Sequence, residues 1–339
     1  MSIREIAKRA NVSTATVSRT INGIKSVDPL LAKRVWRAVN ELSYYPNSQA
    51  RALVSGRSRI FGLIVSEITN PFFPEIVQSF EDMAVQHGYE ILLSSTYNDP
   101  KRTEISVRRM IERRVDGVAV MTFGMEEAIL VDDPKFRDTP LVFVDVGPAV
   151  RRVSNIKIGY LHGIRQAVQH LAALRHRRIA FISGPLKMKS AIARLAAFEK
   201  SMREIALEPK AALIVEGDHT IEGGMKAMSS LLAVQERPTA VICSNDMTAL
   251  GVMHECDQRG ISIPESLSVV GYDDIRLARF MLPPLTTVRM SQAELARLAF
   301  KALLADIQRE VPSEHGSEYQ LNTELVLRES TALAPENQF

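Results

Sequence analysis

The sequence predicts an N-terminal all-α helix-turn-helix head with a hinge helix, followed by an α/β body of two doubly wound parallel-sheet lobes. Three observations predict this fold class. Three short capped helices follow one another at the N-terminus, the first 58 residues are strongly basic, and apolar strands alternate with helices from residue 60 onward. The 339 residues, 46% of them hydrophobic, are sufficient for two or three domains with ample cores.

The first helix of the head begins at once, because Ser2 and Glu5 have the spacing of a capping box. Asn11 ends this helix, and Ser13 is placed to cap a second one. Two short helices separated by three or four residues are typical of a helix-turn-helix. The expected apolar face of the first helix is Ile3, Ile6, Ala7 and Ala10, and that of the second is Ala15, Val17 and Ile21 with Thr20.

A third helix is expected to begin at Asp28-Pro29, with Asp as N-cap and Pro at the first helical position, where its missing N–H has no cost. Its core face is Val35, Ala38, Val39 and Leu42. A three-helix bundle with no special function is the simpler interpretation of these signals.

Charge argues against that simpler interpretation. Residues 1–58 contain ten Lys or Arg and three acidic residues, a net charge of +7, whereas the whole chain carries +3, so the remainder carries −4. A basic head on a mildly acidic body indicates binding to phosphate backbones. The outer side of the second helix also carries short polar side chains that can approach phosphates and base edges: Thr14, Thr16, Ser18, Arg19 and Asn22.

The run Val12-Ser13-Thr14-Ala15-Thr16-Val17-Ser18-Arg19-Thr20-Ile21-Asn22 resembles the helix-turn-helix signature of the lactose/galactose repressor family of bacterial transcription factors. Tyr45-Pro46-Asn47 and Ala50-Arg51-Ala52-Leu53 are similar to the hinge segment of that family. The resemblance extends along almost the whole chain. It implies DNA contacts by Ser13, Thr14, Ala15, Thr16, Ser18, Arg19, Asn22, Tyr44, Asn47, Ala50, Arg51 and Leu53.

Residues 47–54 form the connector, and a helix of two turns at most is marginal by itself in water. It is either a disordered linker or a segment that folds only when its partner is present. The family resemblance favours the second, because paired hinge helices of the family enter the minor groove. Leu53 matches the leucine that wedges a base step there, a mechanism that bends DNA.

From residue 60 the pattern is βαβ repetition with nearly continuous apolar strands, which predicts parallel sheets covered by helices on both faces. The expected strands are residues 60–65, 89–95, 117–121, 141–144, 178–182, 212–215, 240–243, 268–271 and 286–288, with a last strand at 319–327. The resemblance implies that the chain passes between two lobes three times, near residues 157–160, 285–290 and 316–320. The expected domains are residues 1–46 for the head, 47–58 for the hinge and linker, 59–158 plus 289–317 for the first lobe, and 159–288 plus 318–332 for the second lobe.

Polar and aromatic residues follow the strands, where ligands of such sheets bind. Taken singly, each of them has a structural alternative, such as a turn former, a helix cap or a core residue. Their chemistry suits a sugar or polyol as well as a nucleobase, because Asp, Asn and Arg pair with hydroxyls and rings offer flat faces. Together they match the family's ligand-contact positions: Phe72, Phe73, Asp145, Ser190, Arg194, His219, Asn245 and Asp273.

Three departures from the family bear on the ligand. Met188 stands where purine-responsive relatives place an arginine, which disfavours a purine. His219 stands where many relatives place a larger aromatic residue. Lys187 and Lys189 are either solvated surface charges or a sign of an anionic ligand, such as a sugar acid or sugar phosphate.

The resulting hypothesis is a DNA-binding regulator, a repressor of a sugar-utilisation operon, that binds a pseudo-palindromic operator as a homodimer and responds to a sugar-like effector. The alternatives are a corepressor-dependent regulator, or a sugar-binding protein or enzyme without a regulatory role. Enzyme motifs, a signal peptide and long apolar runs are absent from the sequence, so we expect no catalysis, no membrane partner and a cytoplasmic location. No cofactor or metal is expected, and Cys243 and Cys256 are expected to be packed thiols.

Overall fold

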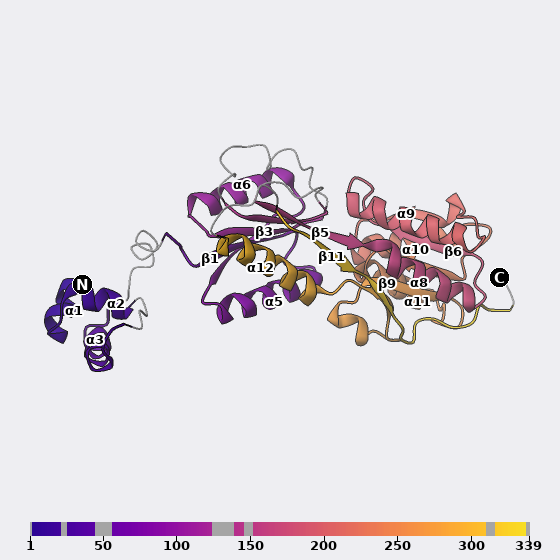
Figure 1. The fold of residues 1–339 in the computed structure, drawn as a ribbon. Helices are drawn as coiled ribbons and strands as arrows, with labels where there is room; N and C mark the ends of the chain where they lie inside the picture. The colour runs from indigo at the N-terminus through magenta and orange to yellow at the C-terminus, as the bar shows by residue number, and fades with distance from the viewer. Residues whose placement is uncertain are drawn as a thin grey trace. The chain divides into compact units, whose positions relative to one another are not determined.

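The structure is a computed structural model that describes residues 2–21, 26–44, 56–123, 139–145, 152–309 and 316–336. The chain divides into two compact units, Met1–Arg59 and Ile60–Phe339 (Figure 1). Among the described residues, no helix is long and apolar enough to cross a membrane.

The first unit contains α1 (Ile3–Ala10), α2 (Thr14–Ile21) and α3 (Pro29–Glu41). The three predicted N-terminal caps are confirmed. Ser2 and Glu5 bond reciprocally in a capping box, the Thr16 N–H donates to Ser13 Oγ, and Asp28 Oδ1 accepts from two backbone N–H groups of α3.

The three helices share a small apolar core, formed by Ile6, Ala7, Ala10, Val17, Val35, Ala38 and Val39. Two expectations for this core were wrong. Ile3 is exposed at the start of α1, and Ala15 is exposed on α2 instead of contributing to its apolar face. A helix of eight residues buries only a narrow stripe, and in α2 this stripe is Val17 and Thr20.

The second unit has two six-stranded sheets, each defining a lobe. The first sheet has the order β11-β5-β4-β3-β1-β2, and all its strands are parallel. Its strands are β1 (Ile60–Val65), β2 (Glu90–Ser95), β3 (Gly117–Met121), β4 (Leu141–Val144), β5 (Val153–Gly159) and β11 (Glu318–Asn322).

Helices cover both faces of this sheet. α5 (Phe72–Gln86) and α12 (Gln292–Gln308) pack together against one face, and α6 (Pro100–Glu112) lies on the other (Figure 1). Alternate residues of β1 point to opposite faces, so that Leu63 joins the core under α5 and Ile64 joins the core under α6.

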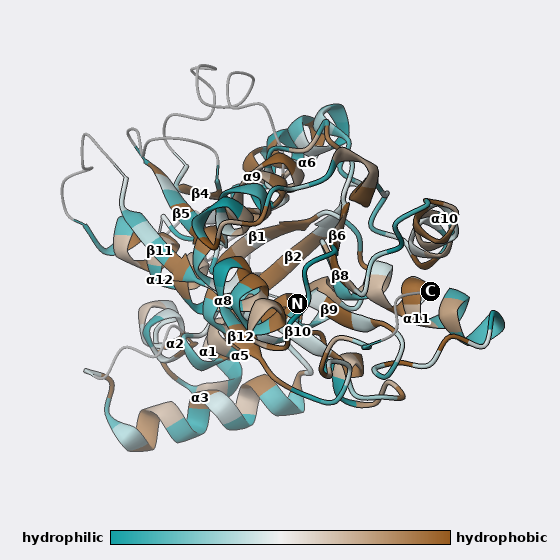
Figure 2. Cartoon of the chain, turned by 90° about the vertical axis from the view of Figure 1, so that its right-hand side faces the viewer, coloured by the Kyte–Doolittle hydropathy of each residue, from teal (hydrophilic) through white to brown (hydrophobic). Residues whose placement is uncertain are grey.

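The second sheet has the order β12-β10-β9-β8-β6-β7, and its strands are β6 (Ile179–Ser183), β7 (Ile214–Glu216), β8 (Ala240–Cys243), β9 (Ser268–Asp273), β10 (Thr286–Arg289) and β12 (Glu324–Val326). Its helices are α8 (Tyr160–Ala173), α9 (Lys189–Glu204), α10 (Ile221–Leu232) and α11 (Asp246–Gln258), with short 3₁₀ turns η2 (Ala211–Leu213) and η3 (Arg276–Arg279). Figure 2 shows that the strands are hydrophobic and that the helices around them have hydrophilic outer faces. The predicted doubly wound pair of lobes is confirmed, and both cysteines are buried thiols.

Two strand predictions were wrong. No strand was expected at β5, because Ser154, Asn155 and Lys157 interrupt its apolar character. Ser154 is nevertheless fully buried, since it donates to Asp306 and accepts from the Ser317 N–H.

The single last strand expected near residues 319–327 is two strands in different sheets. β11 pairs parallel with β5 in the first lobe, and β12 pairs antiparallel with β10 in the second. The fully buried Thr323 separates them and donates to the Gly159 carbonyl.

The chain therefore crosses between lobes after Gly159, between Arg289 and Gln292, and at Thr323. The third crossing comes later than residues 316–320, and the expected lobe boundary at residues 317/318 was too early. The reason is the pairing of β11 with the first sheet.

Candidate functional site

The DNA-binding residues predicted on the head gather on and around α2. Ser13, Thr14, Ala15 and Arg19 are exposed, whereas Thr16 and Ser18 are partly buried. The Ser13 hydroxyl caps α2, because it accepts from the Thr16 N–H, and it lies 2.9 Å from the Thr16 hydroxyl. Tyr44 packs against the head core, and Asn22, Asn47, Ala50, Arg51 and Leu53 lie outside the described residues.

We expect Arg19→Ala to weaken binding to a specific duplex and to relax preference at one base pair per half-site. An arginine in the major groove contacts guanine through two hydrogen bonds, which are worth about 1–3 kcal/mol of discrimination. Binding to a panel of single-base-pair variants of the selected duplex measures this. Equal loss on every duplex would show that Arg19 contacts only phosphate.

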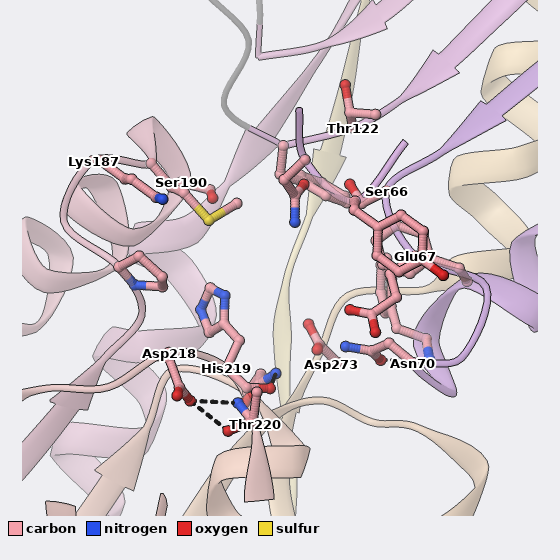
Figure 3. Close-up of a pocket in the computed structure, with 18 of the residues that line it drawn as sticks. Ser66, Glu67, Asn70, Thr122, Lys187, Ser190, Asp218, His219, Thr220 and Asp273 are labelled. Carbon is pink, nitrogen blue, oxygen red and sulfur yellow. Dashed lines mark hydrogen bonds between the residues drawn. The ribbon is translucent and has the colours of Figure 1, made fainter. Parts of the chain in front are cut away.

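The second unit contains a cavity of about 470 Å³ between residues of the two lobes. Seven of the eight residues predicted for the effector line it: Phe72, Phe73, Ser190, Arg194, His219, Asn245 and Asp273. Figure 3 shows Ser66, Glu67, Asn70 and Thr122 of the first lobe opposite Lys187, Ser190, Asp218 and His219 of the second lobe. These strand ends converge because parallel strands end at the same edge of each sheet.

Arg194, in the second turn of α9, is a cation of the cavity wall and only 4% exposed. Its Nη1 donates to the Ser244 carbonyl at 2.5 Å, and its Nη2 lies 3.8 Å from Asp273 Oδ1. The guanidinium carbon lies 4.1 Å from the centre of the Tyr272 ring, a cation–π contact. These contacts hold a planar donor group rigidly at the cavity wall.

Asp273 ends β9 with a φ of 110°, a conformation that L-residues rarely adopt. Gln292 Nε2 donates to its backbone carbonyl at 2.8 Å. Burial raises the pKa of the Asp273 carboxyl to about 7, although the Arg194 guanidinium opposes this rise. A strained backbone and a perturbed carboxyl at a cavity wall are typical of a binding site.

Asn245 and His219 complete the wall of the second lobe. Asn245 caps α11 through the Thr248 N–H and donates to the His219 carbonyl at 3.1 Å, so it also fixes the loop that carries His219. Burial, together with the nearby Arg194 guanidinium, lowers the pKa of His219 to about 3. The ring is therefore neutral at pH 7 and packs against Gly184, where a Cβ atom would clash.

The wall contributed by the first lobe is aromatic. Phe72 and Phe73 begin α5 with ring centroids 5.2 Å apart, and Phe123, after β3, lies 5.7 Å from Phe72. The cavity thus combines an apolar wall with a polar one, as small-molecule sites do.

Among the described lining residues, four buried polar atoms have no hydrogen-bond partner: Ser66 Oγ, Thr122 Oγ1, Arg194 Nε and His219 Nε2. Buried polar groups are normally paired, so unpaired ones in a cavity indicate where a ligand's hydroxyls or water bind. Ser66 and Thr122 were missed in the sequence, although each directly follows a strand, β1 or β3.

Asp145 is the predicted effector residue that does not line this cavity. It lies beside a neighbouring hollow of about 430 Å³, which Ser190 also lines together with Lys189. Its Oδ1 accepts from the Ile158 N–H at 2.9 Å, and its Oδ2 accepts from the Tyr160 hydroxyl at 2.6 Å. Lys187, by contrast, lines the main cavity, so the two lysines do not form one anion site.

Among the described residues, no cluster of three or more His, Cys, Asp or Glu side chains could hold a metal ion. Arg175, in the turn before His176, adopts a φ of 67°.

We expect Asp273→Asn to raise the melting temperature more at pH 8 than at pH 5. An acid whose folded pKa is raised from 3.8 to about 7 destabilises the fold progressively as pH rises between these values, because the unfolded chain ionises first. Asparagine removes this loss and tolerates the positive φ. Thermal melts of the wild type and the variant from pH 4 to 8 give the difference in melting temperature at each pH. His219 is present in both proteins, so its opposite contribution cancels in this difference. Parallel curves would show that Asp273 does not titrate in this range.

A helix-turn-helix head joined to a two-lobed body with a polar ligand cavity defines a class, the ligand-responsive DNA-binding regulators. The sequence model "Bacterial regulatory proteins, lacI family" matches residues 2–47, and "Periplasmic binding protein-like domain" matches residues 168–331. The chain belongs to the lacI family of bacterial regulatory proteins, and it is a transcriptional regulator, not an enzyme.

Relatives of known function support this assignment over the whole chain. The HTH-type transcriptional repressor PurR of Klebsiella pneumoniae (strain 342) is 34% identical over 98% of this chain and 97% of its own. The Lac repressor dimer bound to operator and the anti-inducer ONPF is similar in structure, with a TM-score of 0.87, 29% identity and coverage of 98% of this chain and 99% of that one. The complex of the transcriptional regulator CelR with cellobiose is also similar in structure, with a TM-score of 0.69 and 29% identity. The match covers 97% of this chain and 99% of that one.

Proposed function

We propose that this regulator represses transcription by binding a pseudo-palindromic operator as a homodimer, and that a small sugar or sugar derivative in the cavity of the second unit controls this binding. The observation that carries the effector assignment is the polar wall of the cavity. Arg194, Asp273 and Asn245 present fixed donors and acceptors, and buried polar atoms around them lack partners. Adjacent hydroxyls of a sugar pair with such groups.

The relatives support the other parts of the proposal. The Lac repressor forms a dimer on its operator, and CelR binds cellobiose. Arg19 and the exposed residues of α2 would read the operator, and residues 47–58 would join the head to the lobes. Such a protein acts in the bacterial cytoplasm, at the nucleoid.

A corepressor-dependent regulator with a nucleobase ligand is the second candidate, because three phenylalanines line the cavity. The flat face of a nucleobase would stack on such rings. In this case the ligand strengthens DNA binding, whereas an inducing sugar weakens it.

One pair of measurements tests the proposal and separates the two candidates. Thermal shift against sugars, sugar acids, sugar phosphates, nucleobases and nucleosides identifies the ligand, since binding to the folded state alone raises its stability. The gel shift of a palindromic duplex selected from a random library then gives the sign of the ligand effect. We expect a sugar to give the largest thermal shift and to release the duplex. A chain that selects no duplex would refute the proposal.

A further inference from the structure

Tyr160 stands at the first crossing between the lobes and contacts both of them. It is the first residue of α8, directly after β5, and its side chain is buried. It does not line the main cavity, but it lines the neighbouring hollow beside Asp145.

On the side of the second lobe, Tyr160 is connected to the cavity through Arg194. The guanidinium carbon of Arg194 lies 5.5 Å from the centre of the Tyr160 ring and 4.1 Å from that of Tyr272. The two rings are themselves 6.4 Å apart, so Arg194 rests against a pair of aromatic faces. A ligand that pairs with the free Nε of Arg194 would therefore bind a guanidinium that already contacts both rings.

On the side of the first lobe, Tyr160 contacts Asp145, which directly follows β4. The Tyr160 hydroxyl donates to Asp145 Oδ2 at 2.6 Å, a short bond to a carboxylate. Asp145 Oδ1 is occupied by the Ile158 N–H, and its backbone has a φ of 55°. Both oxygens of Asp145 are thus used to hold the crossing, although the position was expected to bind ligand.

We propose that Tyr160 is a positioning residue that couples Arg194, at the cavity wall, to Asp145 in the first lobe, and thereby couples the cavity to DNA affinity. The inference rests on the proposed function and adds the route of regulation. The hydrogen bond of the Tyr160 hydroxyl restrains the relative movement of the lobes at the crossing. Without it, the protein populates more arrangements of the two lobes, and the fraction in the DNA-binding arrangement falls. Apparent affinity falls with the fraction of molecules in the competent arrangement.

The test uses the full chain without any ligand and a fluorescent palindromic duplex selected from a random library by the wild-type protein. Tyr160→Phe keeps the ring beside Arg194 and removes only the bond to Asp145. We expect its affinity for the duplex at 25 °C to fall about tenfold, within the roughly 5–150-fold range of allosteric couplings. A purely structural role would lower the melting temperature and leave this affinity unchanged while the protein remains folded.

Two further variants complete the experiment. Asp145→Asn, which tolerates the left-handed backbone, is expected to weaken DNA binding in the same direction. In the double variant with Tyr160→Phe, the loss of DNA-binding free energy is expected to be smaller than the sum of the two single losses, because both changes act on one contact. The matched control is Tyr319→Phe in β11, whose hydroxyl lies outside the Tyr160–Asp145 contact and which should bind DNA like the wild type.

The outcomes separate the two proposals. If the wild-type chain binds its duplex and Tyr160→Phe binds it equally well or more tightly, the role of Tyr160 is refuted and the proposed function stands. Additive losses in the double variant also refute it. If the wild-type chain selects no duplex, both proposals fall.

Discussion

Arg194→Ala is expected to abolish the response to the effector while leaving DNA binding without ligand largely intact. The side chain is buried at the cavity wall, where its guanidinium forms an ion pair with Asp273. Hydrogen bonds to charged groups contribute about 1.5–3 kcal/mol each, so loss of the guanidinium should lower ligand affinity by roughly two decades. Titration calorimetry with the ligand identified by thermal shift measures this loss.

The control for this variant is Arg203→Ala on the same helix. Arg203 is exposed and forms a 3.5 Å ion pair with Glu199, and an exposed pair of this kind is worth at most about 1 kcal/mol. Ligand affinity should therefore match the wild type. A normal effector response in Arg194→Ala would show that the effector binds elsewhere.

Leu53→Ala is the reciprocal change, in the proposed hinge outside the described residues. We expect ligand affinity to be unchanged and specific DNA affinity to be reduced, because an apolar wedge in the minor groove acts only on DNA. Together the two variants separate the cavity from the hinge.

The second large effect is expected at an exposed apolar stretch after β9. Leu277, Phe280 and Leu282 are 48%, 70% and 92% exposed within six residues of chain. Contiguous apolar exposure marks an interaction surface, and we propose a second copy of the chain as its occupant. Phe280→Glu/Leu282→Glu should convert the dimer to a monomer, because two carboxylates per chain would be buried in the interface.

Light scattering at micromolar concentration measures the change in mass. DNA affinity should fall by about 100-fold or more, since linked half-site binding raises avidity by roughly 10²–10⁴ over a single head. Leu333→Glu, at a 62% exposed leucine near the C-terminus, is the control and should remain dimeric. A wild-type monomer or a stable tetramer would contradict the homodimer itself.

Elements with local signals were predicted well. The capping residues Ser2, Ser13 and Asp28 begin three helices as expected, and the apolar runs at β1, β3 and β8 are strands. The physical reason is that caps and apolar runs act within a few residues of the chain. Seven predicted effector positions line one cavity for a related reason, since the ends of parallel strands meet at one edge.

What the sequence alone settles is the class of fold, the basic head and the family, because these depend on composition, periodicity and a contiguous motif. Tertiary structure alone decides where long-range partners meet. β5 is a strand because it pairs with β4 and β11, and Ser154 is buried there with its hydroxyl bonded to Asp306. Thr323 separates the last two strands, which lie in different sheets. Asp145 bonds with Tyr160 instead of facing the main cavity, since the crossing brings that hydroxyl to its carboxylate, and no local pattern encodes such a meeting.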